Sequence, residues 1–174
     1  DFEFTEWSHK LAHVKIPKQV KKHWLLANST HVLDLAFYLI GLPDEGNWQS
    51  WSSGNIDWHN SAARFNGAGV SKKGIPFTYH ADWEAPGRWG LDIMTRNNRY
   101  LLKPLEQLQT IPLGELIPRQ VELGGDLDIK FKPGLFRQSE SFLSDNEHSH
   151  SRLCSLAEQV KAFSVYCKIA NYHS

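Results

Sequence analysis

The sequence predicts an α+β domain: an open, mainly antiparallel β-sheet with helices packed on one face. Short segments of alternating apolar and polar residues, joined by tight turns, fill the middle of the chain, and strands joined in this way pair antiparallel. Segments with helical apolar spacing flank them, and a helix with an apolar stripe buries it against another layer. With 174 residues, 41% of them apolar, residues 1–174 are interpreted as one domain.

The N-terminal segment predicts a strand with one buried face. In residues 1–7, Phe2 and Phe4 alternate with polar side chains, which is the period of a β-strand. The basic stretch 10–22 is interrupted by Pro17 and is predicted to be irregular. Because the chain begins without Met and directly in this strand, we interpret its start as the cut edge of a longer protein.

Residues 31–40 predict a largely buried helix, since apolar side chains nearly surround it. Asn28, Ser29 or Thr30 can cap its free amide groups, and Gly41 and Pro43 end it.

The middle of the chain predicts an antiparallel meander. Alternating segments occur at residues 63–67, 75–83 and 89–93, and in the second of these the outward face carries Thr78, His80 and Asp82. The predicted turns between strands are Lys72-Lys73-Gly74, Ala85-Pro86-Gly87 and Asn97-Asn98.

The last third of the chain predicts a proline-containing loop at 104–118, a strand at 121–131, a short helix at 135–143 and a polar loop at 147–150. A final helix follows at 153–170. Its apolar residues recur at three- and four-residue spacing and are expected to cover one side of the sheet: Leu153, Leu156, Val160, Phe163, Cys167 and Ala170.

Composition excludes several classes of protein. Nineteen basic residues balance 19 acidic ones, so the chain lacks the basic field that nucleic acids and membrane surfaces attract. No apolar run approaches the roughly 20 residues that span a bilayer, and the first residues are not a signal peptide. The only cysteines, Cys154 and Cys167, fall in one predicted helix and cannot pair with each other, which indicates reduced thiols and a cytoplasmic setting.

His31 is the leading candidate for chemistry. It falls in the first turn of the predicted helix, where backbone amides can receive a polar substrate group, and a histidine can act as an acid or base near neutral pH. Asp34 and Tyr38 share its helix face, so Asp34 could orient the imidazole. The alternative is a His–Asp pair that only satisfies a helix end.

The other candidates have simpler interpretations. The nine histidines accompany no zinc-binding motif, so no metal site is expected. The glycine-rich stretch 66–74 connects two predicted strands, which favours a hairpin over a phosphate loop. Five tryptophans offer either a ring-stacking platform or, as we prefer, core and interface contacts: Trp48, Trp51, Trp58, Trp83 and Trp89.

Two stretches resemble the C-terminal domain of the Gfo/Idh/MocA oxidoreductases, which include glucose–fructose oxidoreductase and inositol dehydrogenase. Trp24-Leu25-Leu26-Ala27-Asn28-Ser29-Thr30-His31-Val32-Leu33-Asp34-Leu35 is similar to the family's His-x-x-Asp helix, and Lys132-Pro133-Gly134-Leu135-Phe136-Arg137-Gln138 with Phe142 to its late substrate-side helix. The order of elements agrees over almost the whole chain. The resemblance therefore implies the dihydrodipicolinate reductase-like fold of that domain.

The resemblance also implies a function. NAD or NADP would be bound mainly by an N-terminal Rossmann domain absent from this chain, and no cofactor-binding residues are expected here. The substrate would be a hydroxyl-bearing sugar, nucleotide sugar or cyclitol, and the sheet face would form a homodimer or homotetramer. His31 would be the catalytic acid or base. Candidates for substrate binding are Trp24, Asn28, Thr30, Phe136 and Arg137.

The chain departs from the family at one catalytic position. Many members carry Asp four residues before the histidine, where this chain has Ala27. The family's Glu-Lys-Pro lysine does not occur here either, so this domain alone is expected to be inactive. The rival hypothesis is a non-catalytic binding or assembly module that uses the Trp-rich sheet face.

Overall fold

The computed structural model describes residues 1–123, 125–150 and 153–172 and contains one eight-stranded sheet in the order β2-β3-β4-β1-β5-β6-β7-β8. Among the strands of the described residues, only β1 and β4 pair in parallel, so the predicted mainly antiparallel sheet is confirmed. The antiparallel pairing predicted across the turn Ala85-Pro86-Gly87 is wrong, because β1 lies between β4 and β5. The strands are β1 Phe2–Phe4, β2 Pro43–Ser53, β3 Arg64–Ser71, β4 Pro76–Asp82, β5 Trp89–Met94, β6 Asn98–Leu102, β7 Leu108–Pro112 and β8 Arg119–Val121.

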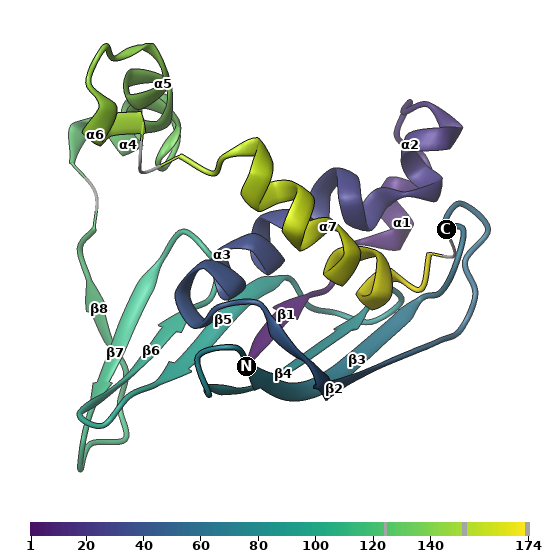
Figure 1. The fold of residues 1–174 in the computed structure, drawn as a ribbon, viewed down its shortest axis with the longest axis horizontal. Helices are drawn as coiled ribbons and strands as arrows, with labels where there is room; N and C mark the ends of the chain where they lie inside the picture. Colours follow the sequence, from purple (N-terminus) through teal and green to yellow (C-terminus); the bar gives the residue numbers. More distant parts are fainter. Residues whose placement is uncertain (124, 151–152, 173–174) are drawn as a thin grey trace.

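The helices lie on one side of the sheet, as predicted (Figure 1). Helices α3 and α7 cover the central strands, whereas α4, α5 and α6 form a separate group beyond the β8 edge. The helical elements are α1 Ser8–Leu11, α2 Lys18–Lys22, the π-helical turn η1 Leu25–Ser29, α3 Thr30–Ile40, α4 Asp126–Phe131, α5 Leu135–Leu143, α6 Glu147–His150 and α7 Leu156–Ala170. No helix in the described ranges is long and apolar enough to cross a bilayer.

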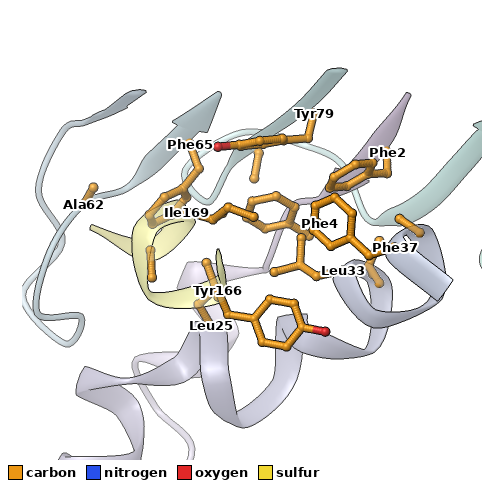
Figure 2. Packing of buried hydrophobic residues seen from close by; sticks show 14 of the residues in the cluster. Phe2, Phe4, Leu25, Leu33, Phe37, Ala62, Phe65, Tyr79, Tyr166 and Ile169 are labelled. Carbon is orange, nitrogen blue, oxygen red and sulfur yellow. The ribbon is translucent and has the colours of Figure 1, made fainter. Parts of the chain in front are cut away.

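The core lies between the sheet and the helices α3 and α7 (Figure 2). Phe2 and Phe4 of the central strand β1 point into it, and their rings lie 5.4 and 5.9 Å from the Tyr79 ring of β4. Leu33 of α3 and Tyr166 of α7 close the core from the helix side. The predicted alternation of β1 therefore positions both phenylalanines correctly.

Two predictions for the last third of the sheet are wrong. The strand predicted at 121–131 ends at Val121, and α4 follows, because Gly125 precedes a first turn whose Asp126 and Asp128 favour a helix N-terminus. The predicted loop at 104–118 contains β7, which Pro112 ends without breaking the ladder.

Several helix boundaries also differ from prediction. The stretch 10–22 was predicted to be irregular but contains the end of α1 and all of α2, on either side of Pro17. Residues 147–150 form α6 rather than a loop. The final helix begins at Leu156 rather than Leu153, because Ser155 and Glu158 form a capping box, and Cys154 therefore lies outside it.

The predicted buried face of α7 is largely wrong. Leu156, Val160 and Phe163 are 81%, 65% and 51% exposed, although Ala170 is buried as predicted. The helix contacts β2 and β3 along a different stripe, because its C-terminal half lies on the sheet while its N-terminal half extends beyond it (Figure 1). The buried residues of this stripe are Ala162, Tyr166, Ile169 and Ala170.

Candidate functional site

His31 is exposed in the first turn of α3. Its imidazole packs at an angle against Trp89, with the ring centroids 5.8 Å apart. No side chain caps α3, because η1 runs directly into it with helical backbone angles. The predicted capping roles are therefore wrong. The polar side chains at residues 28–30, called the helix mouth below, have other hydrogen-bond partners.

Thr30, Asn28 and Ser29 make hydrogen bonds at the N-terminal end of α3. Thr30 Oγ1 donates a hydrogen bond to the carbonyl of Leu26 at 3.1 Å. Asn28 Nδ2 and Ser29 Oγ both donate to Glu6 Oε1, at 3.0 and 2.8 Å. The helix mouth is thus tied to the end of β1 by a carboxylate.

Asp34 does not orient His31. Its Oδ1 accepts a hydrogen bond from the Tyr166 hydroxyl at 3.0 Å, and in the described part of the chain His31 makes no side-chain hydrogen bond. Burial and the adjacent Asp34 carboxylate raise the pKa of Tyr166 well above its usual range. The predicted His31–Asp34 pair is therefore wrong, since α7 supplies a closer partner for the carboxylate.

A cavity of about 590 Å³ lies between α3 and α7. His31 borders it, and both cations and carboxylates line it. Both of its acidic side chains are already engaged, because Asp34 accepts from Tyr166 and Glu158 belongs to the capping box. Its polar lining residues are His31, Asp34, Tyr38, Lys73, Cys154, Glu158, Lys161 and Tyr166.

Lys73 lines this cavity, and its side chain passes beside Gly41. Gly41 ends α3 with a φ of +84°, and a Cβ built there would lie 3.1 Å from Lys73 Cγ. Gly41 therefore both ends the helix and leaves room for the lysine stem beside the cavity. This brings a basic side chain from the β3–β4 turn close to the helix that carries His31.

Of the six predicted site residues, only His31 lines the cavity between α3 and α7. Trp24 precedes η1 and packs against the core, with its indole nitrogen buried and without a partner in the described residues. Phe136 and Arg137 lie in α5, where the Phe136 ring stacks on Phe131 at 5.2 Å, and neither lines the His31 cavity. From α5, Gln138, Ser139 and Phe142 line a neighbouring cavity that shares Leu153 and Cys154 with the first one.

Sequence reasoning missed Glu6. Only 2% of this residue is exposed, and it accepts from Asn28, Ser29, Arg88 and Trp89. The signal was present, because the alternation of Phe2 and Phe4 continues to Glu6 on the same buried face. A carboxylate at a core position needs dedicated partners, and here they surround the helix mouth.

The tryptophans mostly belong to the core. Trp48 and Trp83 are buried and Trp58 and Trp89 half-buried, which confirms the core interpretation, whereas Trp51 is 53% exposed. A stacking platform of five tryptophans is therefore wrong.

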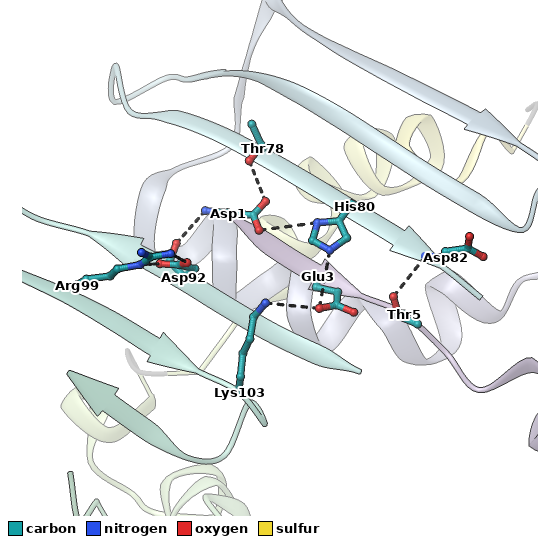
Figure 3. Close-up of polar contacts among 9 residues, drawn as sticks. All are labelled: Asp1, Glu3, Thr5, Thr78, His80, Asp82, Asp92, Arg99 and Lys103. Atoms are coloured by element: carbon teal, nitrogen blue, oxygen red, sulfur yellow. Dashed lines mark hydrogen bonds and ion pairs between the residues drawn. The ribbon is translucent and has the colours of Figure 1, made fainter. Parts of the chain in front are cut away.

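The open face of the sheet is polar at its centre (Figure 3). The outward positions Thr78 and His80 are confirmed, and both lie close to Asp1. Glu3 pairs with Lys103 at 3.5 Å. The face therefore offers charges of both signs, flanked by exposed apolar groups such as Trp51 and Met94.

The glycine-rich stretch 66–74 does not fit a dinucleotide pyrophosphate. The glycine-rich stretch 66–74 is the β3–β4 hairpin, as predicted, and a Cβ on Gly67 would lie only 2.2 Å from the Tyr79 ring. These glycines therefore serve sheet packing rather than a helix N-terminus. Among residues 1–123, 125–150 and 153–172, no group of three or more His, Cys, Asp or Glu could hold a metal ion.

No family model and no curated protein matches this sequence. Among solved structures, the fold of this chain is similar to part of levoglucosan dehydrogenase. Its complex with NADH aligns at 18% identity over 71% of this chain and 39% of its own, with a TM-score of 0.51. Its complex with NADH and L-sorbose aligns at 17% identity over 71% and 40%, also with a TM-score of 0.51.

The chain thus spans about two fifths of the length of that enzyme. At this identity the likeness concerns the fold, and it confirms the α+β fold that the Gfo/Idh/MocA resemblance implies.

Proposed function

We propose that residues 1–174 are the C-terminal substrate-binding and oligomerisation domain of an NAD- or NADP-dependent oxidoreductase that acts on a hydroxyl group of a sugar, nucleotide sugar or cyclitol. The observation that carries this proposal is His31 at the edge of a cavity of about 590 Å³, in a domain with the fold of part of levoglucosan dehydrogenase. That volume lies in the range of small-molecule sites. The nicotinamide supplies the hydride chemistry.

In this proposal His31 exchanges a proton with the reacting hydroxyl group. Its imidazole is exposed and carries no hydrogen bond to the described residues, so both ring nitrogens are available to substrate or solvent. Position 27, where the family often has Asp, is an exposed Ala, and Asp34 is bonded to Tyr166. Proton transfer therefore rests on His31 without a carboxylate partner from its own helix.

The main partner in this proposal is the protein's own N-terminal Rossmann domain. Large apolar side chains are exposed on the helix-bearing side of the sheet, and soluble domains seldom expose many of them without a partner. A further domain over this side would cover them and complete the site beside His31. They include Tyr38, Phe142, Leu143, Leu156, Val160 and Phe163.

We assign the open face of the sheet to a homodimer or homotetramer contact. Trp51 and Met94 are exposed there by their strand register, and tryptophan and methionine are typical of interfaces. The rival, a non-catalytic assembly module, loses its main support because the other four tryptophans considered for this face pack in or against the core. A cytoplasmic setting fits the two free cysteines, Cys154 and Cys167.

The test is reduction of NAD⁺ and NADP⁺ by a panel of sugars and cyclitols, using the protein in which this domain follows its nucleotide-binding domain. The proposal expects turnover with at least one polyol substrate and none with residues 1–174 alone. Tight cofactor binding without turnover of any sugar or cyclitol would contradict it.

A further inference from the structure

We infer that Glu6 is a positioning residue for the His31 site: it orients the Asn28 amide and holds Trp89 against His31, so that Asn28 Oδ1 and the imidazole together receive a substrate hydroxyl group. This inference rests on the proposed function for the identity of the ligand. The arrangement of the protein groups stands on the structure alone.

Four hydrogen-bond donors converge on the carboxylate of Glu6. Its side chain is 2% exposed and accepts hydrogen bonds from four residues in two other segments of the chain. Oε1 accepts from Asn28, Ser29 and the Trp89 indole nitrogen, the last at 3.2 Å. Oε2 accepts from Arg88 at 3.0 Å. A buried carboxylate with this many donors is fixed in position.

The second step is the orientation of the Asn28 amide. An ionised carboxylate can only accept hydrogen bonds, so the Asn28 atom that faces Glu6 must be Nδ2. Oδ1 then lies on the other side of the amide, and no group in the described ranges donates to it. Asn28 donates to the same Glu6 oxygen as the Trp89 indole, and the His31 imidazole packs against Trp89. The side chains of Asn28 and His31 therefore both lie on the side of the helix N-terminus that faces Glu6 and Trp89.

The third step is the link to His31 through Trp89. The Trp89 indole is held at its nitrogen by Glu6 and covered by the Arg88 guanidinium, whose Cζ lies 4.3 Å from the ring centroid. Arg88 is itself paired with Glu6. The surface on which the His31 imidazole rests is therefore fixed by the same carboxylate.

The class of ligand follows from these atoms. Asn28 Oδ1 is an acceptor, and a neutral imidazole offers one donor and one acceptor. A hydroxyl group, which donates once and accepts through its oxygen, matches this pair, whereas a carboxylate would face Oδ1 with no proton to donate. The inference thus assigns a neutral hydroxyl group to this part of the site.

The test compares Glu6→Gln with Glu3→Gln, the same change on the same strand but on the open face of the sheet. The glutamine amide cannot accept at both of its terminal atoms, so at least one donor to position 6 loses its partner. We expect the NMR signals of the Trp89 indole N–H and of the His31 ring protons to shift in Glu6→Gln and to stay in place in Glu3→Gln. Unchanged Trp89 and His31 signals in Glu6→Gln would overturn the inference.

Ser29→Ala gives a second measurement if Glu6→Gln does not fold. It removes one donor to Oε1 and is expected to move the same two residues' signals in the same direction by a smaller amount. Absence of any shift at Trp89 would count against the inference in this variant as well.

Kinetics of the two-domain protein separate positioning from folding. Glu6→Gln is expected to lower kcat about ten- to a hundredfold with little change in the cofactor Kd, as misplacement of a reacting group does. An equal loss in Glu3→Gln would overturn the positioning role. The NMR comparison needs neither cofactor nor turnover, so a wild-type protein without oxidoreductase activity would contradict the proposed function while the NMR result still decides the role of Glu6.

Discussion

The imidazole of His59 is the clearest buried titratable group outside the candidate site. Its Nδ1 lies 2.9 Å from the carbonyl of Ala62, which can only accept, so Nδ1 carries the proton. Its Nε2 lies 2.6 Å from the Tyr172 hydroxyl and accepts from it. The residue is 5% exposed, and burial lowers the pKa of His59 from 6.5 to about 4.

This arrangement predicts a stability loss in mild acid. The unfolded chain takes up the proton near pH 6.5, whereas the folded chain resists it down to about pH 4, so the free energy of unfolding falls as the pH drops through that window. Between pH 7 and pH 5 we expect His59 to contribute a loss of about 2 kcal/mol, measured by urea unfolding. The substitution His59→Gln should flatten this pH dependence, and the same change at exposed His9 should leave it intact. An equally steep profile in His59→Gln would contradict the assignment.

Site residues could be identified from the sequence where their role depends on local position in a helix. His31 and Asn28 were found at the helix mouth because helix signals are local. Their partners were not found, since Asn28 bonds to Glu6, 22 residues away, and Asp34 bonds to Tyr166, 132 residues away. Hydrogen-bond partners of this kind depend on the packing of separate elements, which residue spacing does not encode.

At the scale of elements, the capping box of α7 gives a direct prediction. Ser155 Oγ accepts from the backbone N–H of Glu158 at 3.2 Å, and the Glu158 carboxylate accepts from the Ser155 backbone at 2.8 Å. Ser155→Ala should lower the free energy of unfolding by about 0.5–2 kcal/mol in thermal or urea unfolding. Ser164→Ala, at an exposed position inside the same helix, should change it by less than about 0.5 kcal/mol. Equal effects at both positions would show that the cap does not stabilise the helix.

The two sides of α7 should respond differently to truncation. Ile169 is fully buried, so Ile169→Ala should cost about 2–5 kcal/mol of the free energy of unfolding. Val160 is 65% exposed, so Val160→Ala should change it by less than about 0.5 kcal/mol. Urea unfolding of the 174-residue chain measures both. A large loss in Val160→Ala would mean that the exposed stripe is packed within this chain.

The sequence predicted most helices and strands correctly, but it predicted their buried faces and their end residues less well. The alternation in β3, β4 and β5 identified strands because one face of each packs on the helices. The stripe of α7 was misassigned because apolar spacing along a helix does not specify which of its apolar residues pack on the sheet of this chain. The segment 121–131 was misassigned because six of its residues, in α4, are stabilised by a first turn with two aspartates rather than by sheet pairing.

At the scale of the whole molecule, the open sheet face predicts self-association. Trp51 and Phe163 are exposed to similar extents, 53% and 51%, but on opposite sides of the domain. In sedimentation velocity the wild-type chain and Phe163→Ser should form the same dimer or tetramer, and Trp51→Ser should shift toward monomer. Identical masses for all three proteins would contradict the assignment of this face.

The strand order differs from prediction at the centre of the sheet. Hairpin turns predicted the antiparallel neighbours β3–β4 and β5–β6 correctly, whereas the turn predicted at Ala85-Pro86-Gly87 joins two strands that do not pair. The insertion of β1 between β4 and β5, parallel to one and antiparallel to the other, joins segments more than seventy residues apart. Such a pairing depends on how the faces of the whole sheet meet the helices.

The central claim is that His31 transfers a proton in a nicotinamide-dependent reaction. Its most direct test is the turnover of His31→Asn in the two-domain protein, measured beside the Kd for NADH or NADPH, with His9→Asn as the control. For His31→Asn we expect an unchanged cofactor Kd and a kcat about 10²–10⁴-fold lower, which is the range for loss of general acid–base catalysis. A kcat equal to that of the wild type would contradict it.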